Sequence, residues 1–219
     1  VVVEPMARNT AAAIAMAACR LDPETVMLVC PSDHHIADTA AFARSAARAA
    51  SLAEEGWLVA FGITATAPET GFGYIKRGEP IGEGAYAVER FVEKPDLERA
   101  RHFLSDGGYS WNGGLFAFRA DRFMEELETH RPTIAAAARK AADMGHKDGR
   151  RFHPDAEAFA AIESESVDYA VMENTDRAAV VPASMGWSDI GSWTSLRDAH
   201  VRDQDGNKAH GRAELVDCK

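Results

Sequence analysis

Short apolar runs alternate along the chain with longer stretches in which apolar residues recur at helical spacing. Runs of roughly four to eight apolar, often β-branched residues favour buried strands, whereas longer periodic stretches bounded by polar caps and glycines favour helices. The short runs predict strands at 25–30, 57–63, 87–92, 113–118, 178–182 and 213–216. The periodic stretches predict helices at 11–20, 39–55, 97–104, 121–128, 133–144, 167–173 and 191–200.

Capping and turn residues separate these elements. Asn9 and Thr10 are expected to cap the first helix, Gly56 to end the second, and Asp96 to cap the third. The connections expected from polar and glycine-rich stretches are a turn entering a strand at 70–75, loops at 110–112 and 145–154, and a turn at 203–207. The alternation of strands with helices predicts an α/β fold built on a mixed, mostly parallel sheet flanked by helices.

Length and composition narrow the class of protein. The 219 residues, 46% hydrophobic and 26% charged, suit one large globular domain. The formal charge of −10 argues against a nucleic-acid partner, which needs a basic surface, but leaves a nucleotide ligand open. Three scattered cysteines without a CxxC pair fit a reducing cytoplasm, and no apolar run approaches a membrane span. Oligomeric state is left open, a homo-oligomer included.

Two acidic residues are the best candidates for a metal site. Asp189 lies between Trp187 and Trp193 and beside a glycine, and Asp33 follows the strand predicted at 25–30. Ligands of α/β sheets bind beyond the carboxyl ends of strands, so the two carboxylates are expected to meet there. Two hard oxygen ligands together with phosphate oxygens suit Mg²⁺. The residues alone also allow a turn role for Asp33 and a helix-capping role for Asp189.

Other polar residues near predicted strand ends add a second kind of chemistry. Lys94 is a compact cation suited to a phosphate, and Glu93 beside it can orient the lysine or bind a sugar hydroxyl. Asn112 can both donate and accept hydrogen bonds to hydroxyls. Gly71 and Gly73 would let the backbone approach a ligand closely. Each of these also has an ordinary structural interpretation, as a solvated lysine, a turn asparagine or a glycine turn.

The first helix offers a further candidate for ligand binding. Arg8 and Asn9 come just before it, and a helix N-terminus is suited to anions or base edges. The alternative is that this segment simply caps the helix.

Taken together, the motifs resemble those of the mannose-1-phosphate guanylyltransferases, including the bifunctional phosphomannose isomerase/guanylyltransferases. Each motif is weak alone, but the ordered set covers nearly the whole chain. The matching stretches are EPMARNTAAAIAMAA, VCPSDHHI, TGFGYI, VERFVEKPD, YSWNGGLFAFRA, SVDYAVMENT, GWSDIGSW and DQDGN.

The resemblance implies a Rossmann-like fold of the nucleotide-diphospho-sugar transferase type. It also implies that GTP and α-D-mannose 1-phosphate are converted to GDP-mannose and diphosphate, with Mg²⁺ as cofactor, in a polysaccharide pathway. By the same resemblance, Asp33 and Asp189 are the metal ligands and Lys94 holds the sugar phosphate. Gly71, Gly73, Glu93 and Asn112 are expected on the sugar side, and Arg8, Asn9 and Thr10 on the guanosine side.

The chain also departs from the family pattern. The family begins with a strand and a glycine-rich loop that holds the triphosphate, and neither precedes Val1 here. Residues 1–219 are therefore expected to be a nucleotidyltransferase domain that is not a competent enzyme alone, without the β-helix or isomerase domain of longer members. At position 32 the family more often has Ala than Ser, and at position 113 more often Ser than Gly. Both exchanges are between small residues, so they do not weaken the resemblance.

Two other functions stay open at this point. A nucleotidyltransferase for another hexose 1-phosphate, such as glucose, would carry much the same motifs. A catalytically silent subunit that binds a nucleotide sugar is the second alternative, although it would not need Asp33, Lys94 and Asp189 together.

Overall fold

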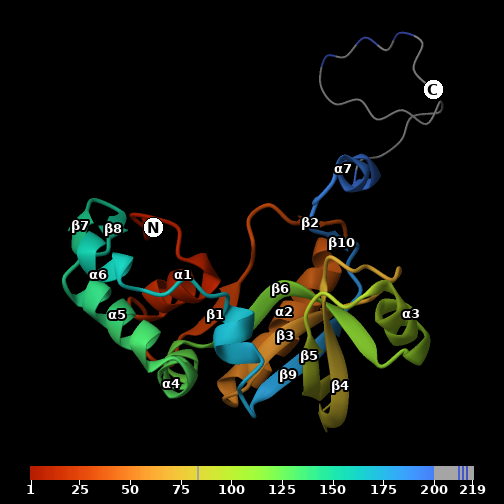
Figure 1. Cartoon of the computed structure of the whole chain (residues 1–219), viewed down its shortest axis with the longest axis horizontal. Coiled ribbons are helices and arrows are strands. Elements are labelled where there is room, and N and C mark those ends of the chain that lie inside the picture. The colour runs from red at the N-terminus through yellow and green to blue at the C-terminus, as the bar shows by residue number, and fades with distance from the viewer. Residues whose placement is uncertain (83, 200–211, 213, 215, 217–219) are drawn as a thin grey trace.

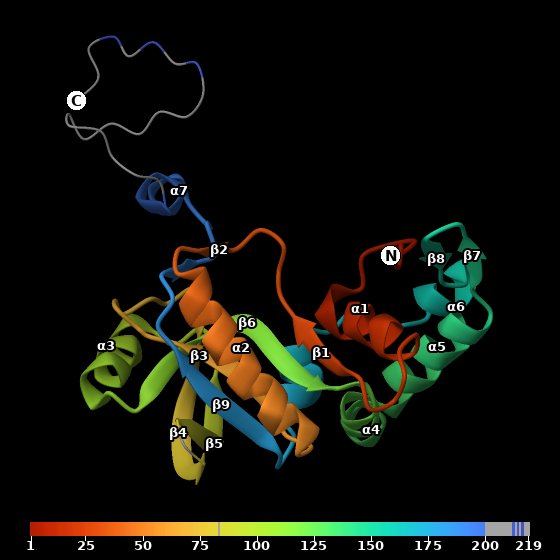
Figure 2. The same ribbon diagram turned by 180° about the vertical axis from the view of Figure 1, so that it is seen from behind.

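The computed structural model describes residues 1–82, 84–199, 212, 214 and 216. A six-stranded sheet forms the centre, with helices on both of its faces (Figures 1 and 2). Its order is β1-β6-β3-β9-β5-β4, with a further pairing between β6 and β4. These strands are β1 (Val26–Val29), β3 (Leu58–Ile63), β4 (Gly73–Gly82), β5 (Ala85–Val92), β6 (Tyr109–Arg119) and β9 (Ala178–Ala183).

The sheet is mixed, as predicted, but the prediction that it is mostly parallel is wrong. Among the paired strands of this sheet, β3 and β9 run parallel and every other pair is antiparallel. The reason is β6, which runs antiparallel between β1 and β3 and so separates strands of one direction. The strands β1, β3 and β9 still point the same way, and their carboxyl ends lie at one edge.

Each face of the sheet has its own hydrophobic core, because side chains alternate between faces along a strand. On one face, Leu58, Ala60, Phe116 and Phe118 pack with the helices α1, α4, α5, α6 and η1. On the other, Val59, Phe61 and Ile63 pack with α2 and α3. The helices are α1 (Asn9–Ala18), α2 (Thr39–Glu54), α3 (Leu97–Asp106), α4 (Ala120–His130), α5 (Pro132–Asp143), α6 (Ala156–Ala160), the π-helix η1 (Asp168–Met172) and α7 (Trp193–Ala199).

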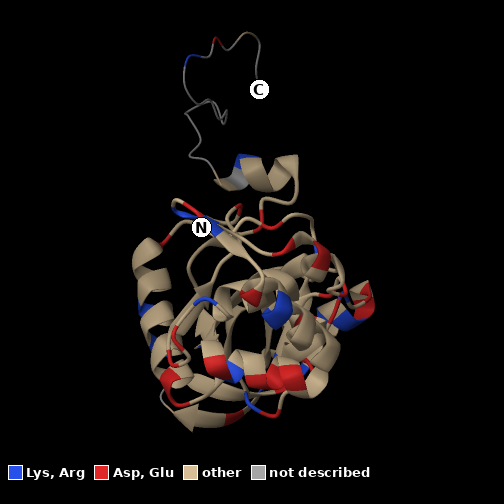
Figure 3. Ribbon diagram, turned by 90° about the vertical axis from the view of Figure 1, so that its left-hand side faces the viewer, with Lys and Arg blue, Asp and Glu red and all other residues tan. Residues whose placement is uncertain are grey.

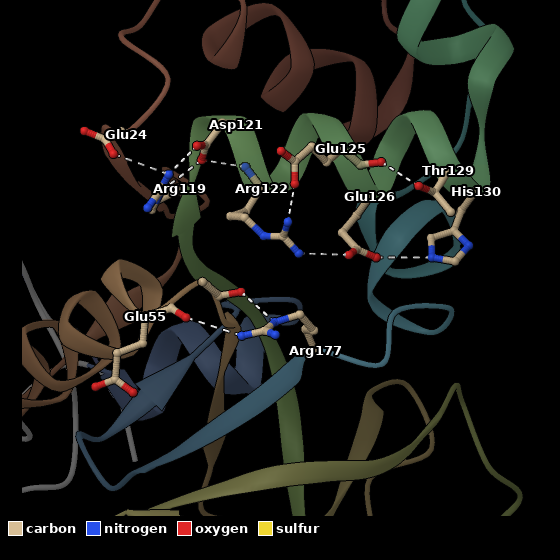
Figure 4. Close-up of polar contacts among 11 residues, drawn as sticks. Glu24, Glu55, Arg119, Asp121, Arg122, Glu125, Glu126, Thr129, His130 and Arg177 are labelled. Carbon is tan, nitrogen blue, oxygen red and sulfur yellow. Dashed lines mark hydrogen bonds and ion pairs between the residues drawn. The ribbon is translucent and has the colours of Figure 1, made fainter.

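Polar contacts connect the end of α2 with the start of β9, and others run along α4 (Figure 4). Arg177, just before β9, donates hydrogen bonds to the carbonyls of Gly56 and Glu55 at the end of α2, over 3.2 and 3.3 Å. On α4, Glu126 contacts both Arg122 and His130. Acidic and basic residues are interspersed on the end of the molecule that carries α4 to α6 (Figure 3). Such surface pairs contribute little stability individually.

Several local predictions need correction. Residues 110–112 are part of β6 rather than a loop, and the predicted loop at 145–154 contains the hairpin β7 (His146–Asp148) and β8 (Arg151–His153). Neither Asn9 nor Thr10 caps α1, because Arg8 occupies the N-cap position without a side-chain hydrogen bond. Gly56 ends α2 with a φ of 87°, and Asp96 caps α3, as predicted.

The strand predicted at 25–30 is present as β1, but it is an edge strand and only partly buried, with Leu28 46% exposed. The turn predicted at 203–207, and residues 213 and 215 of the strand predicted at 213–216, lie outside the described residues. Within the described part of the chain, none of the helices combines the length and apolar character needed to cross a bilayer.

Gly62, in the middle of β3, gives a test of this packing. A Cβ atom there would lie 2.7 Å from Val180 Cγ2 and 2.9 Å from Ser110 Cβ. We expect Gly62→Ala to lower the free energy of unfolding by about 1–3 kcal/mol through overpacking, measured by urea denaturation. Gly71→Ala is the matched control, since a Cβ at that position meets no atom within 4 Å. Equal denaturation midpoints for the two variants would contradict the packing described here.

Candidate functional site

A cavity of about 280 Å³ opens beside the middle of the sheet and gathers residues from distant parts of the sequence. Five of the candidate residues line it together: Gly71, Gly73, Glu93, Asn112 and Asp189. The lining also includes His34, Asp168 and Trp187, to which sequence analysis assigns no ligand-binding role. A second cavity of about 440 Å³ adjoins it and shares Phe72, Trp187 and Asp189 with it.

The position of Asn112 is set by a bulge in β6. Ala60 of β3 is paired with Phe116, but the next pair is Gly62 with Asn112, so extra residues of β6 lie opposite one residue of β3. Gly114 in this bulge has a φ of 66°, which favours glycine. Asn112 Oδ1 accepts a hydrogen bond from the Gly114 amide over 3.2 Å. A bulge of this kind re-aims a side chain, and here it fixes one end of the Asn112 amide.

Gly73 makes room for two polar side chains of the cavity. A Cβ atom at this position would lie 2.7 Å from Glu93 Oε2 and 3.4 Å from Asn112 Cβ. The absence of a side chain therefore lets the carboxylate and the amide face the same space.

Asp168 is the residue that sequence reasoning missed. Its Oδ1 accepts a hydrogen bond from Asn112 Nδ2 over 2.6 Å, and it is the first residue of the π-helix η1. Helices of this rare type occur frequently at functional sites. The available signal was an acid inside the apolar run from Val167 to Met172, within a stretch already matched to a family motif.

Burial and nearby acids favour protonation of Asp168 and Glu173. Burial raises the pKa of the Asp168 carboxyl, the hydrogen bond from Asn112 lowers it, and the nearby Glu93 raises it again. Burial likewise raises the pKa of Glu173, and Asp168 and Glu93 add to that effect. Carboxylates placed in this way accept hydrogen bonds readily, which suits a ligand rich in hydroxyl groups.

A two-stranded sheet links the segments that carry Asp33 and Asp189. β10 (Trp187–Ser188) pairs antiparallel with β2 (His35–Ile36), and Ser188 lies opposite His35. Trp187, two residues before Asp189, also donates a hydrogen bond over 3.1 Å to Nδ1 of His34, the neighbour of Asp33. Asp189 Oδ1 accepts a hydrogen bond from the Gly191 amide over 3.0 Å. Asp189 therefore lines the cavity, whereas Asp33 is exposed beside it.

Lys94 stays at the rim of the site rather than inside it. Its side chain is 66% exposed, and its Nζ lies 3.4 Å from Glu93 Oε1. The backbone at Lys94 has a φ of 41°, one of three positive values among described residues other than glycine, and the other two are 63° at Asn9 and 52° at Ile190. Such conformations cost about 1–3 kcal/mol each and cluster at functional sites. All three lie in segments that the sequence marked as functional.

The segment from Arg8 to Thr10 does not line the cavity but is hydrogen-bonded to the chain that leads into the π-helix. Arg8 Nη2 donates to the carbonyl of Ala160 over 2.6 Å, and Thr10 Oγ1 accepts from the amide of Val167 over 2.8 Å. These contacts hold the chain that leads directly into Asp168. The guanosine-side role of Arg8, Asn9 and Thr10 stays a prediction.

A family model described as "Nucleotidyl transferase" matches residues 1–206. The chain belongs to the nucleotidyl transferase family. The fold of this nucleotidyl transferase is also found in a solved structure from Thermus thermophilus, titled mannose-1-phosphate geranyltransferase. That structure has a TM-score of 0.81 and 34% identity, and covers 92% of this chain and 58% of that one.

Two curated relatives of the nucleotidyl transferase have more specific names. The xanthan biosynthesis protein XanB of Xanthomonas campestris pv. campestris is 52% identical over 222 residues, all of this chain and 47% of that protein. The mannose-1-phosphate guanylyltransferase of Escherichia coli K12 is 49% identical over 220 residues, 96% of this chain and 46% of that protein. The chain thus spans about half the length of the curated relatives it matches.

The raised pKa of Asp168 predicts how stability depends on pH. A carboxyl whose pKa is higher in the folded than in the unfolded state stabilises the fold below its unfolded pKa. This stabilisation is lost as the pH rises through the folded pKa. Asp168→Asn keeps an acceptor for Asn112 but stays neutral at every pH. We therefore expect the variant to have a higher urea midpoint than the wild type at pH 7, with the difference vanishing toward about pH 4.

Asp148→Asn, in the exposed hairpin of β7 and β8, controls for the simple loss of a negative charge. The explanation fails if Asp168→Asn lowers the midpoint at pH 7, or shifts it equally at every pH.

Proposed function

We propose that this protein transfers GMP from GTP to α-D-mannose 1-phosphate, giving GDP-mannose and diphosphate. The observation that carries the proposal is the convergence of Gly73, Glu93, Asn112 and Asp189 on one cavity in a nucleotidyl transferase. A relative at 49% identity bears the name of this activity. The names of other relatives, in xanthan and alginate biosynthesis, favour a role in supplying polysaccharide synthesis.

The reaction needs positioning and neutralisation of charge rather than a covalent intermediate. An oxygen of the sugar phosphate attacks the α-phosphorus of GTP, the bond from that phosphorus to the bridging oxygen breaks, and diphosphate leaves with the electron pair. Glu93 and Asp168 accept hydrogen bonds from sugar hydroxyls, and the second amide hydrogen of Asn112 donates one. Lys94 reaches from the rim to the sugar phosphate and offsets its charge.

The residues present fit a divalent cation. Asp189 lines the cavity, and Asp33 directly precedes His34, which lines it as well. Among the described residues no group of three or more His, Cys, Asp or Glu could hold a metal ion. Mg²⁺ does not need one, since it is held by one or two carboxylates together with substrate phosphates and water. When bound there, Mg²⁺ would neutralise phosphate charge as the leaving group departs.

The activity can be tested by following diphosphate release with each nucleoside triphosphate against mannose 1-phosphate and glucose 1-phosphate, with Mg²⁺ or with EDTA. We expect the full-length protein to turn over GTP with mannose 1-phosphate when Mg²⁺ is present. Lys94→Ala and Asp189→Asn should each lower kcat/KM about 100-fold or more, the scale for removing one group that stabilises developing charge. Lys76→Ala is the matched control, because Lys76 pairs with Glu89 on the surface over 2.8 Å.

Preference for glucose 1-phosphate would favour the first alternative, a nucleotidyltransferase for another hexose. Binding of GDP-mannose without turnover by any substrate pair would favour the second, a silent nucleotide-sugar-binding subunit.

We further propose that an upstream strand completes the domain by pairing with β1. Among described residues β1 pairs with β6 alone, which leaves its other edge open beside the exposed Leu28. An unpaired edge with an apolar side chain is a ready site for an added strand. Residues 1–219 extended upstream by the relatives' corresponding segment should therefore turn over much faster than residues 1–219 alone. Equal rates for the two proteins would refute this.

A further inference from the structure

His34 forms one hydrogen bond that determines which of its ring nitrogens carries a proton. Trp187 Nε1 lies 3.1 Å from His34 Nδ1, with the ring planes at 85° and the centroids 5.2 Å apart. An indole N–H can only donate, so Nδ1 of the imidazole must accept. The proton of the imidazole ring is therefore on Nε2.

The Nε2–H of this ring has no hydrogen-bond partner within the described residues, yet His34 lines the same cavity as Gly73, Asn112 and Asp189. A protonated ring nitrogen has no lone pair for a metal. The ring consequently offers the cavity a single fixed donor, and its partner must be an acceptor atom of the ligand.

The location of the ring identifies that acceptor. Glu93 and Asp168, which line the cavity, are suited as acceptors for hydroxyl groups. His34 directly follows Asp33, and it is hydrogen-bonded to Trp187, two residues before Asp189, which lines the same cavity. Phosphate oxygens are the ligand atoms expected beside those two carboxylates, since a shared cation would bring them there.

We propose that His34, held by Trp187, donates its Nε2–H to a phosphate oxygen of the substrate. This proposal rests on the function proposed above. It adds a hydrogen-bond donor from a segment that is otherwise assigned to metal binding. Trp187 is then a positioning residue, acting through His34. The phosphate is that of the sugar 1-phosphate or that of the nucleotide, and the two sources can be separated by experiment.

The kinetic test compares two amides in the full-length protein. In His34→Gln the amide N–H lies near the place of Nε2–H, whereas His34→Asn has no atom there. We expect His34→Gln to stay within a few-fold of the wild type. His34→Asn should lose about 10- to 100-fold in kcat/KM, the scale for one hydrogen bond to a charged group. His102→Asn, an exposed histidine of α3, should not change turnover. Wild-type rates in His34→Asn would overturn the proposal.

A spectroscopic test does not depend on turnover. In the wild type, ¹⁵N–¹H spectra of the His34 ring should place the proton on Nε2, and in Trp187→Phe the second tautomer should appear. Mannose 1-phosphate and GDP are then added separately, and the one that shifts the Nε2–H signal identifies the source of the phosphate. Mannose alone should cause no shift. A proton on Nδ1 in the wild type, or an equal shift with mannose, would overturn the proposal.

The two proposals can fail separately. If the wild type turns over GTP with mannose 1-phosphate but His34→Asn equals it, the role of His34 is wrong and the function stands. If the wild type is inactive with every substrate pair but the Nε2–H signal still responds to a phosphate ligand, the function is wrong and the phosphate contact stands.

Discussion

The bulge in β6 is the constraint on which the rest of the structure depends. β6 pairs with β1, β3 and β4 along its length, so any change in its path moves three other strands. The bulge closes only because Gly114 adopts a φ of 66° and Asn112 Oδ1 accepts the hydrogen bond of the Gly114 amide. One side chain thus stabilises the bend of the central sheet and faces the candidate cavity. The sheet cannot lose this asparagine contact without also losing the geometry of the site.

The same asparagine connects the sheet to the acidic side of the cavity. Its Nδ2 donates to Asp168, which fixes the amide orientation and leaves one N–H for a ligand. Asp168 in turn is held by a short chain of contacts that begins at Thr10, whose hydroxyl accepts the amide of Val167. The first helix, the π-helix and the bulge therefore form one connected support. Asp168 brings a charge into this support that burial disfavours, which is the usual cost of a site that must bind polar ligands.

Much of this could be predicted from the sequence, because the signals are local. The strand β3 and the helix α2 follow from an apolar run and a helical period, and Asp96 and Gly56 mark helix ends by their own chemistry. What could not be predicted depends on contacts between distant residues. Sequence alone does not reveal that β6 is inserted antiparallel between β1 and β3. The prediction of a mostly parallel sheet is wrong for this reason. Asp168 was missed for the same reason, since its importance comes from a hydrogen bond to a residue 56 positions away.

The positive φ of Ile190 belongs to the turn that holds Asp189 in place. A β-branched residue rarely adopts a positive φ, yet Ile190 does so between Asp189 and Gly191. In that conformation the amide of Gly191 reaches Asp189 Oδ1 and the amide of Ile190 reaches Ser188 Oγ, over 3.0 and 3.2 Å. Both bonds lock the turn that presents the carboxylate. A relaxed turn would cost less free energy but would leave the carboxylate free to rotate, and an acid that must stay ready for a cation gains from being held in place.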